Sequence, residues 1–197
     1  MLEAFLESAA REPLKIGVKM EYFPEETVKR AREIVQLYKD RWTTRKEFLG
    51  GLYDNKFIEA PYGFEDSIRT GRGGHYLHQL KKDADCFSLA GMHYVVAREL
   101  GLSPKLYWAT DMKDVKEGED PVTAMVGNHA FISIMYGGKE CIFDPSMGAF
   151  GKVELKDGKA LIQEVEDSIP QVTERLFSTL TNWSEEDYVA EMNKHQS

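Results

Sequence analysis

Apolar side chains recur every three or four positions in two long stretches of the chain, which is the spacing of an amphipathic helix. The first stretch begins near Pro24, where two glutamates follow and suit the positive end of a helix dipole. The second runs from Cys86 to Leu100 and stops at Gly101. Their apolar positions are Val28, Ala31, Ile34, Val35, Tyr38 and Trp42, then Leu89, Met92, Val96 and Leu100. Both stretches are predicted to be helices with one buried face.

Shorter helices are expected elsewhere. Residues 1–11 form one, ended by Pro13, and residues 168–181 form another. Ser184 looks like the N-cap of a last helix, because three acidic residues follow it. Residues 51–82 lack sustained periodicity and are predicted to be irregular, with one short helix near 75–82.

Alternating apolar and polar positions predict strands at about 104–110, 129–136, 139–144 and 159–165. The pair Gly137-Gly138 predicts a tight hairpin between the second and third strands. The acidic stretch from Lys113 to Gly127 is predicted to be an exposed loop. Because helical segments flank a strand-rich middle, the expected class is α+β with an antiparallel sheet.

The chain has 197 residues, which is the size of one domain that buries a real core. We divide it into an N-terminal helical part (1–50), a core (83–165) and C-terminal helices (166–197). The net charge of −8 argues against a nucleic acid as the main partner, since phosphate binding needs clustered Lys and Arg.

No apolar run approaches the roughly 20 residues that a membrane span needs, so no membrane association is expected. The first residues carry acids where a signal peptide would carry bases, so a cytoplasmic location is expected. Two cysteines do not make a disulfide framework, and Cys141, in mid-strand, is expected to pack in the core. The helix after Trp183 is free to pack on the core or on a partner chain.

Three residues stand in an order that suits a thiol triad. Cys86 opens the second long helix, where the dipole and free N–H groups stabilise a thiolate. His129 opens one predicted strand, and Asp144 ends the next one. A nucleophile at a helix start, a base on one strand and an orienting carboxylate on its neighbour form a working geometry for acyl transfer.

The predicted hairpin brings His129 close to Asp144. Counting outward from the turn, Tyr136 pairs with Lys139, so His129 lies level with about residue 146. Asp144 is then about two residues short of a direct partner, and a diagonal contact or a bulge closes that gap.

The segments around these residues resemble a known family. The run from Asp85-Cys86-Phe87 through Gly101 to Lys105 looks like the nucleophile helix of transglutaminase-like domains and the turn that follows it. Asn128-His129-Ala130 and Phe143-Asp144-Pro145 resemble the His-Ala and Asp-Pro motifs of the same family. The resemblance covers about residues 83–147. It implies a papain-like core of a helix on an antiparallel sheet.

The resemblance also implies roles, with Cys86 as the nucleophile, His129 as the base and Asp144 as the orienting residue. The expected function is a cysteine enzyme that forms a thioester acyl-enzyme on a peptide or protein amide, or on an ester. Hydrolysis is favoured over crosslinking, and no metal or organic cofactor is needed. Gln79, seven residues before the cysteine, is a candidate oxyanion donor as in papain-like enzymes.

The chain departs from the family pattern in ways that keep alternatives open. Phe131 stands where the family has Trp after His-Ala, and no Trp precedes Asp144. A non-catalytic binding domain that keeps the fold is therefore the second hypothesis. A metal-dependent hydrolase that uses His75, His78 and His129 is the third, although the histidine spacing lacks the Cys or Asp/Glu pair of a zinc site.

Overall fold

The computed structural model describes residues 20–39, 63, 73–80, 83–116, 118, 126–136, 139–144, 146, 149–156, 159–163 and 172–196. Three α-helices lie in these ranges: α2 (Glu25–Lys39), α5 (Cys86–Glu99) and α6 (Glu185–Gln196), with a 3-10 turn η1 (Leu77–Gln79). The strands are β1 (Lys105–Lys116), β2 (Val126–Tyr136), β3 (Lys139–Asp144), β4 (Ala149–Lys156), β5 (Lys159–Gln163), β6 (Val172–Leu176) and β7 (Thr179–Trp183).

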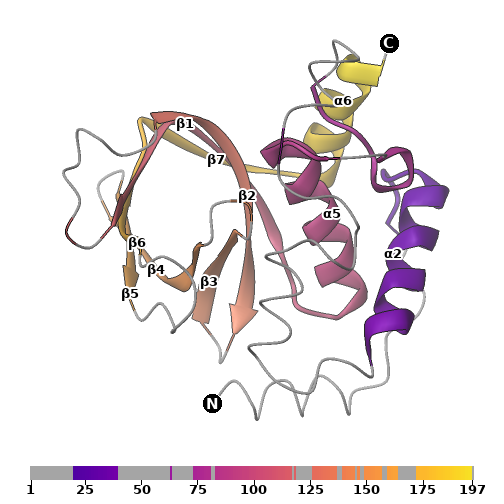
Figure 1. Ribbon diagram of the computed structural model, residues 1–197, viewed down its shortest axis with the longest axis horizontal. Helices are drawn as coiled ribbons and strands as arrows, with labels where there is room; N and C mark the ends of the chain where they lie inside the picture. The colour runs from indigo at the N-terminus through magenta and orange to yellow at the C-terminus, as the bar shows by residue number, and fades with distance from the viewer. Residues whose placement is uncertain are drawn as a thin grey trace.

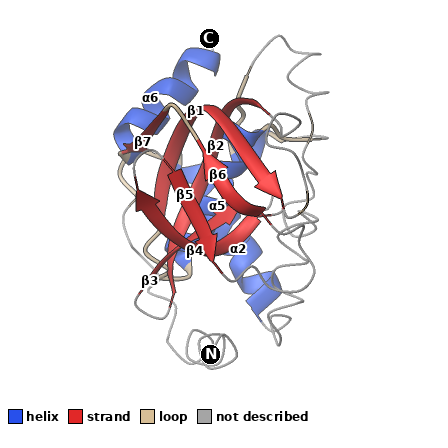
Figure 2. Cartoon of the chain, turned by 90° about the vertical axis from the view of Figure 1, so that its left-hand side faces the viewer, coloured by secondary structure: helices blue, strands red, loops and turns tan. Residues whose placement is uncertain are grey.

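The strands form one antiparallel sheet that closes on itself. The order is β2-β3-β4-β5-β6-β1-β7, and β2 also pairs with β1, so that β1 to β6 make a ring with β7 added beside β1. In Figure 1 this barrel lies on the left, and Figure 2 shows β4, β5 and β6 on its side away from the helices. The α+β class with an antiparallel sheet is confirmed.

Strand β1 reaches two neighbours because it changes direction in its middle. Its register with β2 shifts between Ala109 and Met112, and Asp111 has a positive φ of 50°. Before this irregularity β1 pairs with β7, and after it β1 pairs with β6. The bulge therefore closes the barrel while keeping β7 in the sheet.

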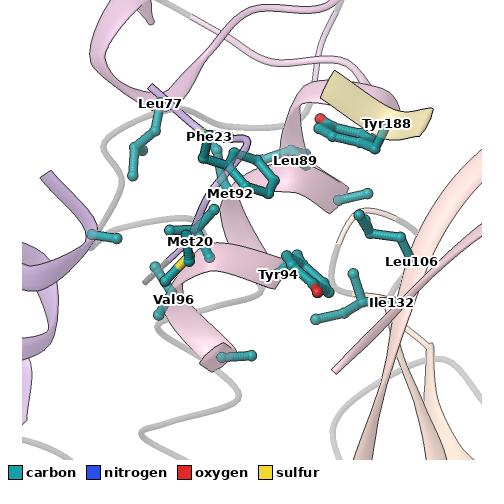
Figure 3. Close-up of a cluster of buried hydrophobic side chains, with 14 of the residues drawn as sticks. Met20, Phe23, Leu77, Leu89, Met92, Tyr94, Val96, Leu106, Ile132 and Tyr188 are labelled. Atoms are coloured by element: carbon teal, nitrogen blue, oxygen red, sulfur yellow. The ribbon is translucent and has the colours of Figure 1, made fainter. Parts of the chain in front are cut away.

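Helix α5 lies between α2 and the sheet (Figure 1). Every described side chain from Phe87 to Ala97 is buried, more than the one apolar stripe of the sequence required, because both sides of the helix are covered. Figure 3 shows the resulting cluster, in which the α5 side chains Leu89 and Met92 lie near Phe23 and the α5 side chain Tyr94 lies near Ile132. The other face of the sheet carries a smaller cluster of Ala109, Met112, Phe131 and Ile142.

Several predicted elements are confirmed. The helices that begin at Glu25, Cys86 and Glu185 are present, and Ser184 caps the last one, since its Oγ accepts from the N–H of Asp187 at 3.1 Å. The four predicted strands are present within a few residues of their expected bounds. Tyr136 pairs with Lys139 as counted.

Other predictions were wrong. The helix over 168–181 is absent where the structure describes this range, because residues 172–176 and 179–183 are β6 and β7. The apolar spacing there fits a helix, but pairing with β1 decides the conformation. The loop expected over Lys113 to Gly127 is wrong at both ends, because β1 runs to Lys116 and β2 begins at Val126. The described part of the short helix expected near 75–82 is only η1. Strand β4 was not predicted.

Four sequence-based predictions lie wholly or largely outside the described residues: the helix over 1–11, the place of Trp42, the irregular stretch 51–82, and the Gly137-Gly138 turn itself. Among the helices that the structure describes, none is long and apolar enough to cross a membrane.

Candidate functional site

Cys86 is the first residue of α5, and its position is set by the residue before it. Asp85 is the N-cap, with extended backbone, and its Oδ1 accepts from the N–H of Ser88 at 2.8 Å. Its Oδ2 accepts from the N–H of Gly74 at 3.0 Å, and the Oγ of Ser88 accepts from the N–H of His75 at 2.6 Å. These bonds tie the segment around Gly74 to the first turn of α5, which holds Cys86 in place.

His129 and Asp144 form a buried pair. The Nε2 of His129 lies 2.8 Å from the Oδ2 of Asp144, and the exposed fractions of the two residues are 3% and 2%. Asp144 Oδ1 also accepts from the Oγ of Ser146 at 2.6 Å. The strand register explains the contact: Ile132 pairs with Phe143, so Asp144 is the diagonal neighbour of His129 across the hairpin.

The charge state of His129 follows from its neighbours. Burial is the largest single influence and lowers its pKa. The charge of Asp144, the hydrogen bond to Asp144, and a hydrogen bond and charge at Cys86 all raise it. Together they raise the pKa of His129 from 6.5 to about 9. The imidazole is therefore protonated at neutral pH. Because Nε2 faces Asp144, Nδ1 is the nitrogen that can face the thiol.

The side chains around the pair hold the imidazole in place. The ring of His129 stacks on Phe131, with centroids 6.0 Å apart, and Phe131 stacks in turn on Tyr107 at 5.6 Å. On the α5 side, the ring of His93 meets Phe143 edge to face. Burial lowers the pKa of His93 to about 4, although the charge of Asp144 opposes this shift. His93 is therefore neutral and leaves His129 as the cation beside Asp144.

A cleft of about 490 Å³ opens beside the thiol. Cys86 is half-buried, which leaves its sulfur reachable from this cleft. The remaining lining residues come from the segment before α5, from α5 itself, from β1 and β7, and from α6: Gly73, Asp85, Phe87, Trp108, Trp183, Glu191 and His195. A thiol at the edge of a cleft with a mostly apolar surface is an arrangement that suits covalent chemistry on a bound substrate.

The structure brings Cys86, His129 and Asp144 together but leaves Gln79 elsewhere. Gln79 is the last residue of η1 and exposed, and its Oε1 accepts from the N–H of Tyr76 at 3.3 Å. It is not among the residues that line the described cleft. Its part in an oxyanion hole stays a prediction.

Two of the three histidines considered for a metal are engaged in other contacts, whereas the buried Nε2 of His75 has no hydrogen-bond partner among the described residues. His78 Nδ1 lies 2.8 Å from the Oγ1 of Thr27, and His129 is bonded to Asp144. Within the described ranges, no group of three or more His, Cys, Asp or Glu side chains could hold a metal ion. Cys141 is buried in the core as expected, with an exposed fraction of 1%.

Sequence reasoning missed the aromatic lining of the cleft. Trp108 lies in a predicted strand, but Trp183 lies at the end of β7, a strand that overlaps the helix expected over residues 168–181. Because β7 was not predicted, nothing in the sequence indicated that the two rings lie together.

No protein-family model matches the chain, and no curated protein is significantly similar to it.

Proposed function

We propose that this protein is a transglutaminase-like cysteine enzyme that forms a thioester acyl-enzyme on an amide or ester and releases the acyl group to water. One observation carries the proposal: a buried His129–Asp144 pair that hydrogen-bonds to Cys86 at the first turn of α5, next to an open cleft. The order of elements supports the same family. The helix with the cysteine precedes the strand with the histidine, and the strand with the aspartate follows.

The proposed first step is attack of the Cys86 thiolate on the substrate carbonyl carbon. A carbon–sulfur bond forms, and the carbonyl electron pair moves to oxygen. His129 is protonated because Asp144 and Cys86 raise its pKa to about 9. It then gives the Nδ1 proton to the leaving amine or alcohol as the carbonyl re-forms and the bond from the carbonyl carbon to the leaving nitrogen or oxygen breaks. The products of this step are the thioester on Cys86 and a neutral imidazole.

The second step regenerates the enzyme. Neutral His129 takes a proton from water at Nδ1, and the hydroxide adds to the thioester carbonyl. Collapse of this adduct expels the Cys86 thiolate and leaves the free acid. Asp144 stays ionised throughout and holds the imidazole orientation through Nε2. Water is proposed as the acceptor because it needs no second binding site beyond the cleft that holds the acyl group.

The oxyanion of each step is proposed to rest near the start of α5. The first N–H groups of a helix have no acceptor within the helix, and the dipole there favours negative charge. The N–H of Ser88 is taken by Asp85, so the N–H of Cys86 itself is the better-placed donor.

The proposal is tested with p-nitrophenyl esters and peptide p-nitroanilides. The purified protein is expected to release nitrophenolate or nitroaniline catalytically and to show a transient acyl adduct on Cys86 by intact mass. Cys86→Ala abolishes both signals, and His129→Ala reduces turnover by roughly 100-fold or more. Cys141→Ala is the matched control and keeps the activity. Turnover that survives Cys86→Ala contradicts the proposal, and a folded wild-type protein without an adduct supports the binding-domain alternative.

A further inference from the structure

The cleft beside Cys86 has a continuous aromatic wall. The rings of Trp108 and Trp183 stack with centroids 5.6 Å apart and planes inclined by 15°. Phe87 stands edge-on to both, at 6.1 Å from Trp108 and 5.7 Å from Trp183. All three side chains line the cleft, and Phe87 directly follows the nucleophile in the chain.

The wall is built by strand register and by helix packing. Leu106 of β1 pairs with Trp183 of β7, so Trp108 is the diagonal neighbour of Trp183 on the same face. From the α6 side, Tyr188 stacks on Phe87 at 4.6 Å and donates its hydroxyl to the Phe87 carbonyl at 2.7 Å. The rings are thus fixed before any ligand arrives, which keeps the entropic cost of binding low.

The charged groups at the cleft are already engaged. Glu191 of α6 accepts from the Nζ of Lys194 at 2.6 Å and lies 3.7 Å from the Nε2 of His195. The carboxylate of Asp85 is committed to the N–H groups of Ser88 and Gly74. A cationic ligand would have to compete for both carboxylates, whereas an aromatic ring finds an open apolar surface.

We propose that this cleft selects substrates with an aromatic acyl group, which lies against Trp108 and Trp183 while its carbonyl carbon faces the sulfur of Cys86. The cleft volume of about 490 Å³ falls in the range of small-molecule sites, roughly 300–1,000 Å³, and accommodates a ring with its attached chain. The inference rests on the proposed function, because it names the substrate class of the same thiol.

Two alkylating probes test the inference without a known substrate. The rates at which iodoacetamide and N-benzyliodoacetamide modify Cys86 are measured by peptide mass spectrometry, each divided by its rate with glutathione. The benzyl probe is expected to show saturation and a normalised rate about tenfold above that of iodoacetamide, the size of a favourable aromatic contact. An N-(4-aminobutyl) analogue, which carries a cation instead of the ring, is expected to gain nothing.

Variants locate the effect. Trp183→Ala is expected to remove the tenfold preference for the benzyl probe over iodoacetamide, and Trp183→Phe is expected to keep part of that preference. Tyr22→Ala, at an exposed aromatic outside the described cleft lining, is the matched control and changes neither rate. A wild-type protein with equal normalised rates for the two probes, or with a preference for the cationic probe, overturns the inference whether or not Trp183→Ala folds.

The same data separate this inference from the proposed function. A fast reaction with iodoacetamide that depends on His129 but shows no benzyl preference removes only the aromatic substrate class. A slow reaction with both probes that is indifferent to His129→Ala removes the thiolate mechanism itself.

Discussion

At the scale of single residues, the site depends on how Asp144 sets the charge of a buried imidazole. Burial at an exposed fraction of 3% would favour the neutral ring of His129, yet the pKa is raised to about 9. The carboxylate at 2.8 Å is the largest of the influences that raise it. Asp144 and Cys86 together outweigh desolvation, so the buried imidazole keeps its proton at neutral pH.

Removing the charge of Asp144 is expected to reverse this balance. In Asp144→Asn the hydrogen bond can persist but the charge is lost, so burial dominates and the pKa of His129 falls well below about 9. The measurement is an NMR titration of the imidazole C–H signals of His129. A wild-type titration near 6.5 that Asp144→Asn leaves unmoved would contradict the account.

The same shift couples the charge of His129 to stability. Its folded pKa of about 9 exceeds the unfolded value of 6.5, so its stabilisation is fully present below pH 6.5 and is lost as the pH rises through 9. Urea unfolding is therefore expected to show a free energy that falls between pH 6.5 and 9.5, with a smaller fall in Asp144→Asn. If the free energy of unfolding falls equally steeply with pH in the wild-type protein and in Asp144→Asn, the loss of the His129–Asp144 ion pair is not the cause of the fall.

The candidate catalytic residues could be predicted from the sequence, but the residues that line the cleft could not. Cys86, His129 and Asp144 were recognisable because each has a local signature, and the hairpin count gave the diagonal contact. Trp108 and Trp183 have no such signature, since an aromatic residue in a strand usually packs in a core.

At the scale of elements, α5 is the central helix, and the sheet and the other two described helices pack around it. It meets the sheet on one side and α2 on the other, and α6 packs near its first turn (Figure 1). Two contacts define these interfaces. One is an ion pair between α2 and α5, and the other is a close approach of α6 to a glycine of α5.

The ion pair joins Arg32 to Glu99. Its N–O distance is 3.1 Å, and the Glu99 side chain is 3% exposed. Arg32→Ala leaves this carboxylate buried without its cation and is expected to lower the free energy of unfolding by about 2 kcal/mol, discounted because Arg32 is 39% exposed. Arg30→Ala breaks the exposed pair with Glu33 and is expected to cost about 0.5 kcal/mol or less in the same urea titrations. Equal losses for the two variants would contradict this ranking.

The close approach is at Gly91. A Cβ there would lie 2.1 Å from the hydroxyl oxygen of Tyr188, so any side chain must push α6 away. Gly91→Ala is expected to cost about 1–3 kcal/mol of stability. Gly127→Ala is the control, because nothing lies within 4 Å of a Cβ at that position. The ring atoms Cζ and Cε1 of Tyr188 would also lie within 3.0 Å of that Cβ, so only removal of the ring relieves the clash. The double variant Gly91→Ala/Tyr188→Ala should therefore lose less stability than the two single losses combined, and strict additivity would argue against the clash.

The elements that the sequence predicted are those with strong local signals. Caps and acidic first turns marked the starts of α2 and α6, and alternation marked β2 and β3. Strands β6 and β7 were not predicted because their apolar spacing also fits a helix. Only pairing with the two halves of β1 decides between a helix and a strand there. Long-range pairing of this kind cannot be read from a local window.

At the scale of the whole molecule, the fold places groups from distant parts of the chain around one sulfur. The helix start supplies the thiol, the barrel strands supply His129 and Asp144, and the C-terminal strand and helix complete the cleft. A closed barrel has no free edge between β1 and β6, so the His129–Asp144 pair sits on a rigid support.

The central claim is that Cys86 is a reactive thiol paired with His129, and its most direct test is alkylation by iodoacetamide across pH 5 to 10. Peptide mass spectrometry follows Cys86, with buried Cys141 as the internal reference. The account predicts that at pH 6 Cys86 reacts at least about tenfold faster than free cysteine, whose thiol is then almost fully protonated, and that His129→Ala removes this advantage. A Cys86 that reacts like free cysteine at every pH, unchanged by His129→Ala, would contradict it.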